Sequence, residues 1–176
     1  MIASRWCVVL LLVLLAASRS VRAQQPETCT SAIPANIQAG VFGQDFLALL
    51  QGSPTFRGQC EQIASARNVR VELSVVRLMG GVRAETAIDR YRGGALRADV
   101  RIAPGQDYRE LIAHEFEHVI EQIDGVDLRQ EAATGRAWLV DRNVFETRRA
   151  LEAGLRVRRE FQLSETHVAV VVHEPR

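Results

Sequence analysis

The sequence contains no lysine, because all 22 of its basic residues are arginines. They are scattered along the chain and nearly balanced by 21 acidic residues, so the formal net charge is only +1. A nucleic-acid-binding domain usually carries a clear basic excess, so this balance argues against a nucleic-acid partner. Aromatic residues make up only 6%, and a core must therefore consist mainly of aliphatic side chains. The remaining composition, 47% hydrophobic and 24% charged, is that of an ordinary globular protein.

The chain also lacks a long hydrophobic run. Its clearest apolar stretch, residues 7–17, has 11 residues, whereas a membrane-spanning helix needs about 20. Arg5 precedes this stretch, and Val21-Arg22-Ala23 follows it with small residues at the −3 and −1 positions of a cleavage site. This pattern predicts a secretory signal peptide over residues 1–23. We therefore expect a secreted or periplasmic protein that keeps no stable membrane anchor after cleavage.

Cysteine is scarce, with three residues in the chain. Cys7 lies in the predicted signal peptide, which leaves Cys29 and Cys60. In an oxidising compartment, such a pair is expected to form one disulfide. The alternative interpretation is two buried free thiols.

Hydrophobic periodicity divides residues 24–176, which we expect to form a single domain. An irregular lead-in is expected over 24–40, followed by short helices over 41–51 and 56–66. Alternating apolar and polar residues predict strands over 69–78, 82–91 and 96–102, joined by turns at Gly80-Gly81 and Gly93-Gly94. Short glycine turns between consecutive strands favour a small antiparallel sheet.

A helix is expected between Asp107 and Gly125. Asp107 can cap its first turn, with Glu110 completing an acidic capping box, and Gly125 can adopt the left-handed conformation that ends a helix. The apolar residues of this segment form one stripe. His114 and His118 lie on another side, away from the expected core.

A second long helix is expected over residues 142–160, capped by Asp141. Its small residues Ala150 and Ala153 would let it approach the first long helix closely. A terminal strand is expected over 168–172, and Trp138 and Phe145 are expected in the core. The predicted fold is therefore α+β, with short N-terminal helices, a small antiparallel sheet, and two long helices packed together.

The first long helix contains the sequence His114-Glu115-Phe116-Glu117-His118. Two histidines at positions i and i+4 can reach one metal ion, and the glutamate after the first can take a proton from a water at that metal. The segment resembles the zincin metallopeptidases. In that family an antiparallel edge strand before the motif helix binds extended substrate, and residues 96–102 occupy that place.

A catalytic zinc needs a third protein ligand. Resemblance to the gluzincin branch implies a glutamate from a later helix, and Glu146 is our main candidate. Asp124 stands where metzincins have their third ligand, although the glycine of that motif is missing, and Glu131 is a further alternative. Glu121 lies on the histidine face but too far along the helix axis, which favours a solvated or supporting carboxylate. Glu152 and Glu160 lie off the small-residue face or near the far end.

The sequence thus predicts a zinc-dependent hydrolase of peptide or protein substrates, with His114, His118 and Glu146 as metal ligands and Glu115 as general base. The candidates for stabilising the oxyanion are Tyr91, Tyr108, His167 and Arg149. The alternative is a non-catalytic exported metal-binding or interaction domain.

Overall fold

The computed structural model describes residue 29, residues 31–141 and residues 144–171, and its side chains are described as far as residue 163. The predicted signal peptide and His173 lie outside these residues. Within the described part of the chain, no helix has the length and apolar character needed to cross a membrane.

The fold is mixed α and β, as predicted. The larger of the two sheets in the described residues has four strands. These are β1 (Ile37–Gln38), β2 (Val69–Val75), β3 (Ala84–Arg90) and β4 (Leu96–Ile102), which lie in the order β1-β2-β4-β3. β1 belongs to the expected irregular lead-in, which therefore contributes one short strand.

The prediction of an antiparallel sheet is wrong, because the sheet is mixed. β2 pairs with β4 in parallel, with Val71 opposite Ala98, and β3 pairs with β4 antiparallel, with Thr86 opposite Val100. The connection over residues 76–83 is long enough to carry β3 past β4 to the far side. β3 is therefore the edge strand, and β4 lies inside the sheet, where the resemblance to zincins had placed the edge.

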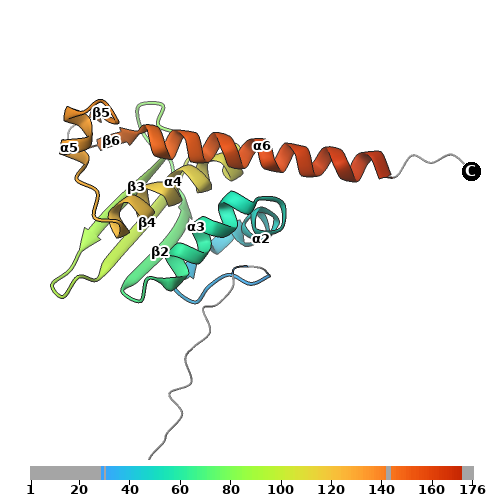
Figure 1. Ribbon diagram of the computed structural model, residues 1–176, viewed down its shortest axis with the longest axis horizontal. Coiled ribbons are helices and arrows are strands. Elements are labelled where there is room, and N and C mark those ends of the chain that lie inside the picture. Colours follow the sequence, from blue (N-terminus) through green and yellow to red (C-terminus); the bar gives the residue numbers. More distant parts are fainter. Residues whose placement is uncertain (1–28, 30, 142–143, 172–176) are drawn as a thin grey trace, which may run out of the picture.

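In the described part of the chain, five α-helices and one 3-10 turn accompany the strands. In chain order they are η1 (Gly40–Phe42), α2 (Gly43–Gly52), α3 (Pro54–Ser65), α4 (Tyr108–Ile123), α5 (Leu128–Ala133) and α6 (Arg148–Val171). The first two α-helices match their predictions closely. Figure 1 shows α4 lying across the sheet, α6 running along α4, and the C-terminal part of α6 extending beyond the sheet.

The core lies between the sheet and helices α2, α3 and α4. Three phenylalanines from these helices meet there: Phe46 and Phe56 have ring centroids 5.0 Å apart, and Phe116 lies 5.4 Å from Phe56. Ser53 caps α3 by accepting a hydrogen bond from the backbone N–H of Phe56 at 3.0 Å. Cys60, also on α3, forms the expected disulfide with Cys29.

The motif helix α4 has the predicted ends. The side chain of Asp107 accepts a hydrogen bond from the backbone N–H of Arg109, and Gly125 has a φ of 74°, in the left-handed region. The carboxylate of Glu110, assigned above to a capping box, pairs with Arg158 at 3.0 Å and lies 3.6 Å from Arg83.

The helix predicted over 142–160 starts later in the structure, because a β-hairpin comes directly before it. Strands β5 (Ala137–Asp141) and β6 (Val144–Thr147) form a two-stranded antiparallel sheet. Thr147, rather than Asp141, caps α6, since its hydroxyl accepts a hydrogen bond from the backbone N–H of Ala150 at 3.0 Å. Branched and aromatic residues over 138–145 suit strands better than helices.

The C-terminal part of the described chain is helical where a strand was expected. Residues 168–171 continue α6, so the terminal strand is wrong. Neither Gly nor Pro interrupts the chain between Gly154 and Pro175, and β-branched residues alone do not end a helix.

Trp138 was expected in the core, but it is 43% exposed and lies outside the core.

Helices α4 and α6 pack closely at Gly154. A Cβ atom at this position would lie 3.0 Å from the backbone oxygen of Glu110 and 3.1 Å from the Cβ of His114. The predicted small-residue contact is therefore present, with Ala150 fully buried and Ala153 8% exposed, and Gly154 is its tightest point.

We expect Gly154→Ala to lower the free energy of unfolding by roughly 1–3 kcal/mol, because neither neighbouring backbone can move without disturbing the other. Gly58→Ala is the matched control: this helical glycine has nothing within 4 Å of the added Cβ, so the change should stabilise by about 0.5–1 kcal/mol. Urea unfolding of both variants measures the difference. Equal effects would contradict the close contact.

Candidate metal centre

Three side chains from two distant parts of the chain converge beside α4. Nε2 of His114 lies 3.2 Å from Oε2 of Glu146, and Nε2 of His118 lies 3.5 Å from Oε1 of the same carboxylate. The two imidazole rings are 5.1 Å apart between centroids. One ligand atom from each residue lies within 4.8 Å of the others.

Two of these separations are close to those between the ligand atoms of a tetrahedral zinc site. With zinc–nitrogen and zinc–oxygen bonds of about 2.0–2.2 Å, tetrahedral ligand atoms lie roughly 3.3–3.6 Å from one another. The distances from Glu146 to His114 and His118, 3.2 and 3.5 Å, lie close to this range and run to the two different oxygens of the carboxylate. Two imidazoles and one carboxylate are also the ligand set of one class of catalytic zinc site, in which the fourth position stays open.

The carboxylate of Glu146 reaches the histidines from β6, not from a helix. This residue is the last but one of β6, directly before Thr147, which caps α6. The predicted ligand residue therefore lies where it was expected, but the structural reason given for it is wrong. The close helix contact at Ala150 and Gly154 positions the start of α6, and β6 delivers the carboxylate.

Charge holds the three side chains together in this structure. Burial raises the pKa of Glu146, but hydrogen bonds with His114 and His118 outweigh it and keep that pKa well below its usual range. Burial lowers the pKa of His118, yet hydrogen bonds with Glu121 and Glu146 raise it to about 10. Ion pairs with Glu146 and Glu121 thus hold these side chains in place.

Glu121 contacts His118 and Thr147 next to the three converging side chains, and it is only 2% exposed. Its Oε2 lies 3.0 Å from Nδ1 of His118, and its Oε1 accepts a hydrogen bond from the hydroxyl of Thr147 at 2.6 Å. One buried carboxylate therefore orients the ring of His118 and also anchors the residue next to Glu146. The sequence interpretation of Glu121 as a supporting carboxylate agrees with this geometry.

Replacing Glu121 with Gln should lower zinc affinity about 10–100-fold, because an amide orients and polarises the imidazole less well than a carboxylate. Glu110→Gln serves as the control, since Glu110 is also buried on α4 but pairs with Arg158. Competition with a chromophoric chelator measures both affinities. An unchanged affinity in Glu121→Gln would show that this contact does not support a metal.

Glu115 lies on the side of α4 that faces the sheet edge and is 3% exposed. Its Oε2 accepts a hydrogen bond from the hydroxyl of Thr86, on edge strand β3, at 2.6 Å. Burial raises the pKa of Glu115, and the neighbouring histidines and Thr86 partly oppose that effect. The candidate base is therefore a largely buried carboxylate held between the motif helix and the edge strand.

Sequence reasoning missed Thr86 and Thr147. Thr86 is opposite the fully buried Val100 in the strand register, so it lies on the helix-facing side of the sheet. Nothing local distinguishes it from other strand threonines, because its role depends on which strand forms the edge. Thr147 could have been found as a capping residue, because it stands three positions before Ala150, where the buried pattern of α6 begins.

The alternative third ligands have other partners. Asp124 accepts hydrogen bonds from Gln62 at 2.9 Å and Arg149 at 2.8 Å. Glu131 pairs with Arg136 at 2.8 Å. Of the remaining carboxylates, Glu152 is exposed, and Glu160 accepts hydrogen bonds from the hydroxyls of Ser53 and Thr55 at 2.5 and 2.6 Å.

The oxyanion candidates are placed as follows. Tyr108 packs against Phe42, with ring centroids 5.0 Å apart, and Tyr91 is 54% exposed in the loop after β3. The guanidinium of Arg149 pairs with Glu117 and Asp124. His167 lies on α6, where its side chain is outside the description. The contacts of Tyr108 and Arg149 are those of structural residues.

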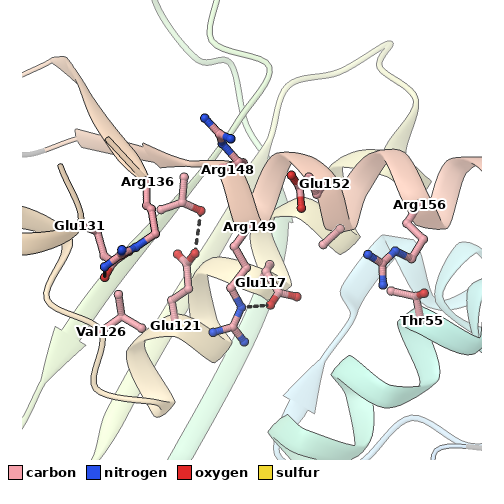
Figure 2. Close-up of a pocket in the computed structure, with 12 residues that line it drawn as sticks. Thr55, Glu117, Glu121, Val126, Glu131, Arg136, Arg148, Arg149, Glu152 and Arg156 are labelled. Atoms are coloured by element: carbon pink, nitrogen blue, oxygen red, sulfur yellow. Dashed lines mark hydrogen bonds and ion pairs between the residues drawn. The ribbon is translucent and has the colours of Figure 1, made fainter. Parts of the chain in front are cut away.

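A groove of about 600 Å³ lies beside His114, His118 and Glu146 but is not lined by any of these three residues. Figure 2 shows Glu121 and Arg149 pointing into it, with dashed contacts from Glu121 to a neighbouring threonine and from Arg149 to Glu117. Its charged side chains carry both signs: the lining includes Glu117, Glu121, Glu131, Glu152, Arg136, Arg148, Arg149 and Arg156. Because its charges are balanced and several are paired with each other, we assign the chemistry to the histidine cluster and not to this groove.

Comparison with known proteins gives no relative from which a function could be transferred. The chain matches no protein-family model, and neither a curated protein nor a solved structure shows significant similarity to it.

Proposed function

We propose that this protein is an exported zinc-dependent peptidase of the zincin type. The observation that carries the proposal is the convergence of His114, His118 and Glu146 at distances suited to one tetrahedral ion. The position of Glu115, next in sequence to one ligand and beside the edge strand, also supports it. The disulfide between Cys29 and Cys60 agrees with export.

In this mechanism Zn²⁺, when bound, would polarise the peptide carbonyl and lower the pKa of an adjacent water. Glu115 takes a proton from that water as its oxygen adds to the carbonyl carbon. The proton then passes to the amide nitrogen as the carbon–nitrogen bond breaks, which releases an amine and a carboxylic acid. Thr86 keeps the carboxylate of Glu115 in place during both transfers.

The edge of the sheet offers a place for the substrate backbone. Among the described strands, β3 pairs only with β4 and has its other edge free. An extended peptide can add to such an edge through main-chain hydrogen bonds. The contact between Thr86 and Glu115 brings this edge next to the proposed base, so a peptide lying along β3 would pass the histidine cluster.

The second candidate is a non-catalytic exported metal-binding or interaction domain. One observation favours it: the carboxylate of Glu115 is nearly fully buried and already accepts a hydrogen bond from Thr86. In this alternative, Glu115 joins α4 to β3 and takes no part in proton transfer. The two candidates share the metal site and differ in hydrolysis.

The metal site itself is tested by elemental analysis of protein purified without chelators and supplied with zinc. We expect about one zinc per chain, because three ligands converge at one point. His114→Ala should lose most of this zinc, whereas His167→Ala, at a histidine remote in sequence from the motif, should retain it. The absence of bound metal in the wild-type protein would overturn the peptidase and the metal-binding form of the second candidate, and would leave only an interaction domain.

A further inference from the structure

The β5–β6 hairpin places two large apolar side chains on the same face as the proposed ligand Glu146. Trp138 is directly opposite Glu146 in the strand register, and side chains of opposed residues in an antiparallel pair share a face, with Cβ atoms about 4.5–5.5 Å apart. Val144 precedes Glu146 by two residues on β6, so it lies on that face too.

The two faces of the hairpin have different surroundings. Thr147, on the other face, is 3% exposed and hydrogen-bonded to Glu121, and its partner Ala137 is 4% exposed. Trp138 and Val144 are 43% and 47% exposed. Because the carboxylate of Glu146 reaches both histidines, the face with Trp138 is the one that continues outward from the metal centre.

We propose that Trp138 and Val144 line a subsite for a large apolar side chain of the substrate, next to the peptide bond that is cut. This inference rests on the proposed peptidase function and adds a substrate class to it. Any peptide whose carbonyl reaches the histidine cluster must pass close to Glu146. Successive Cα atoms of a peptide are 3.8 Å apart, so the side chain next to that carbonyl comes within reach of the cross-strand neighbour of Glu146.

The side chains on the Trp138 face of the hairpin favour contact with an apolar side chain of the substrate. Glu146 is committed to the two histidines, so its charge is not free to attract a basic side chain. Trp138 and Val144 offer an aromatic ring and a branched aliphatic group, which remain in water until an apolar group covers them. A phenylalanine or leucine side chain would fit this surface better than an aspartate or arginine side chain.

The first test uses five heptapeptides that differ only in a central residue, which is Phe, Leu, Ala, Asp or Arg. Wild-type protein with zinc should cleave the Phe and Leu peptides with the highest kcat/KM. Trp138→Ala should lower kcat/KM for these two about tenfold and change the Ala peptide little, since one apolar contact is worth roughly 1–3 kcal/mol. Leu139→Ala is the matched control, because Leu139 is 58% exposed on the opposite face of the hairpin.

The second test measures binding without cleavage. The chain has two tryptophans, Trp6 and Trp138, and Trp6 lies in the predicted signal peptide, so Trp138 is the only tryptophan in protein produced without residues 1–23. In such zinc-loaded protein that carries Glu115→Gln, the Phe peptide should shift Trp138 emission to shorter wavelengths, and the Asp peptide should not. Circular dichroism of each variant shows whether it is folded.

The outcomes separate the inference from the function on which it rests. Cleavage that shows no apolar preference, or a preference that Trp138→Ala leaves unchanged, overturns the subsite while the peptidase stands. An apolar-selective emission shift without cleavage by the parent protein supports the surface and overturns the peptidase. A shift that grows with protein concentration in the absence of peptide, together with a dimer in sedimentation, shows that a second copy covers this face and overturns the inference.

Discussion

Glu115→Gln is expected to retain zinc and to lower the rate of peptide hydrolysis by about 10²–10⁴-fold, the contribution usual for a general base. Glutamine has nearly the same size as glutamate, and its amide oxygen can still accept the hydrogen bond from Thr86. It cannot take a proton from water. The variant should therefore fold and bind metal as the parent protein does, and it should fail only at the proton transfer.

Glu117→Gln is the natural control for this experiment. Glu117 lies in the same motif and is also buried, but its carboxylate contacts Gln59 at 2.6 Å and Arg149, away from the histidines. This change should affect stability and leave the turnover of the remaining folded protein close to that of the parent. Zinc content, far-UV circular dichroism and kcat/KM are measured for all three proteins.

Two results would contradict the assignment of Glu115 as the base. If the Glu115→Gln variant hydrolyses peptides at the parental rate, another group accepts the proton. If it loses zinc and unfolds while Glu117→Gln does not, the contact between Glu115 and Thr86 is structural, and the non-catalytic candidate is favoured. A parent protein that binds zinc but cleaves no peptide between pH 5 and 9 leads to the same conclusion.

The parts of this site that could be predicted from the sequence are those fixed by local rules. Asp107 and Gly125 mark the ends of α4 through hydrogen bonding and backbone conformation, which depend on a few neighbouring residues. Given the helix, the spacing of His114 and His118 places both rings on one side. No knowledge of the rest of the chain is needed for either step.

The sheet order could not be predicted in the same way. Glycine turns before and after residues 84–90 suggest a meander, but β3 crosses to the far side of β4 and leaves β2 and β4 in parallel contact. That choice depends on how the strands pack against α4, a contact between residues distant in sequence. Because the edge strand was misplaced, the contact of Thr86 with Glu115 was missed as well.

Glu146 is an instructive intermediate case. The small residues Ala150 and Ala153 correctly indicated that a helix approaches α4 closely. Residues 142–147 were wrongly included in that helix, because Asp141 resembles a cap and the helical pattern continues smoothly backwards. The true cap is Thr147, so Glu146 reaches the histidines from the last but one position of a strand, on the same face as Trp138.

Removal of the third ligand should have the largest effect on metal binding. We expect Glu146→Ala to lower zinc affinity by a larger factor than a change at a residue that only orients a ligand. Changes of that second kind typically cost about 10–100-fold in affinity. Without the carboxylate, the two imidazoles supply fewer bonds to the ion and no negative charge to offset its positive charge. His118 also loses one of the two carboxylates beside it, so the ring is held less firmly.

Glu152→Ala is the matched control, since Glu152 is an exposed carboxylate that lies on α6, six residues after Glu146. Asp124→Ala and Glu131→Ala test the alternative ligands and should also keep zinc, because these carboxylates pair with Arg149 and Arg136. Competition against a chelator of known affinity gives all four constants. If Glu146→Ala keeps its zinc while either alternative loses it, the gluzincin-like ligand set is wrong, although the two histidines can still hold the metal. If all four variants bind like the parent, none of these four carboxylates ligates the ion, and the proposed three-ligand site is wrong.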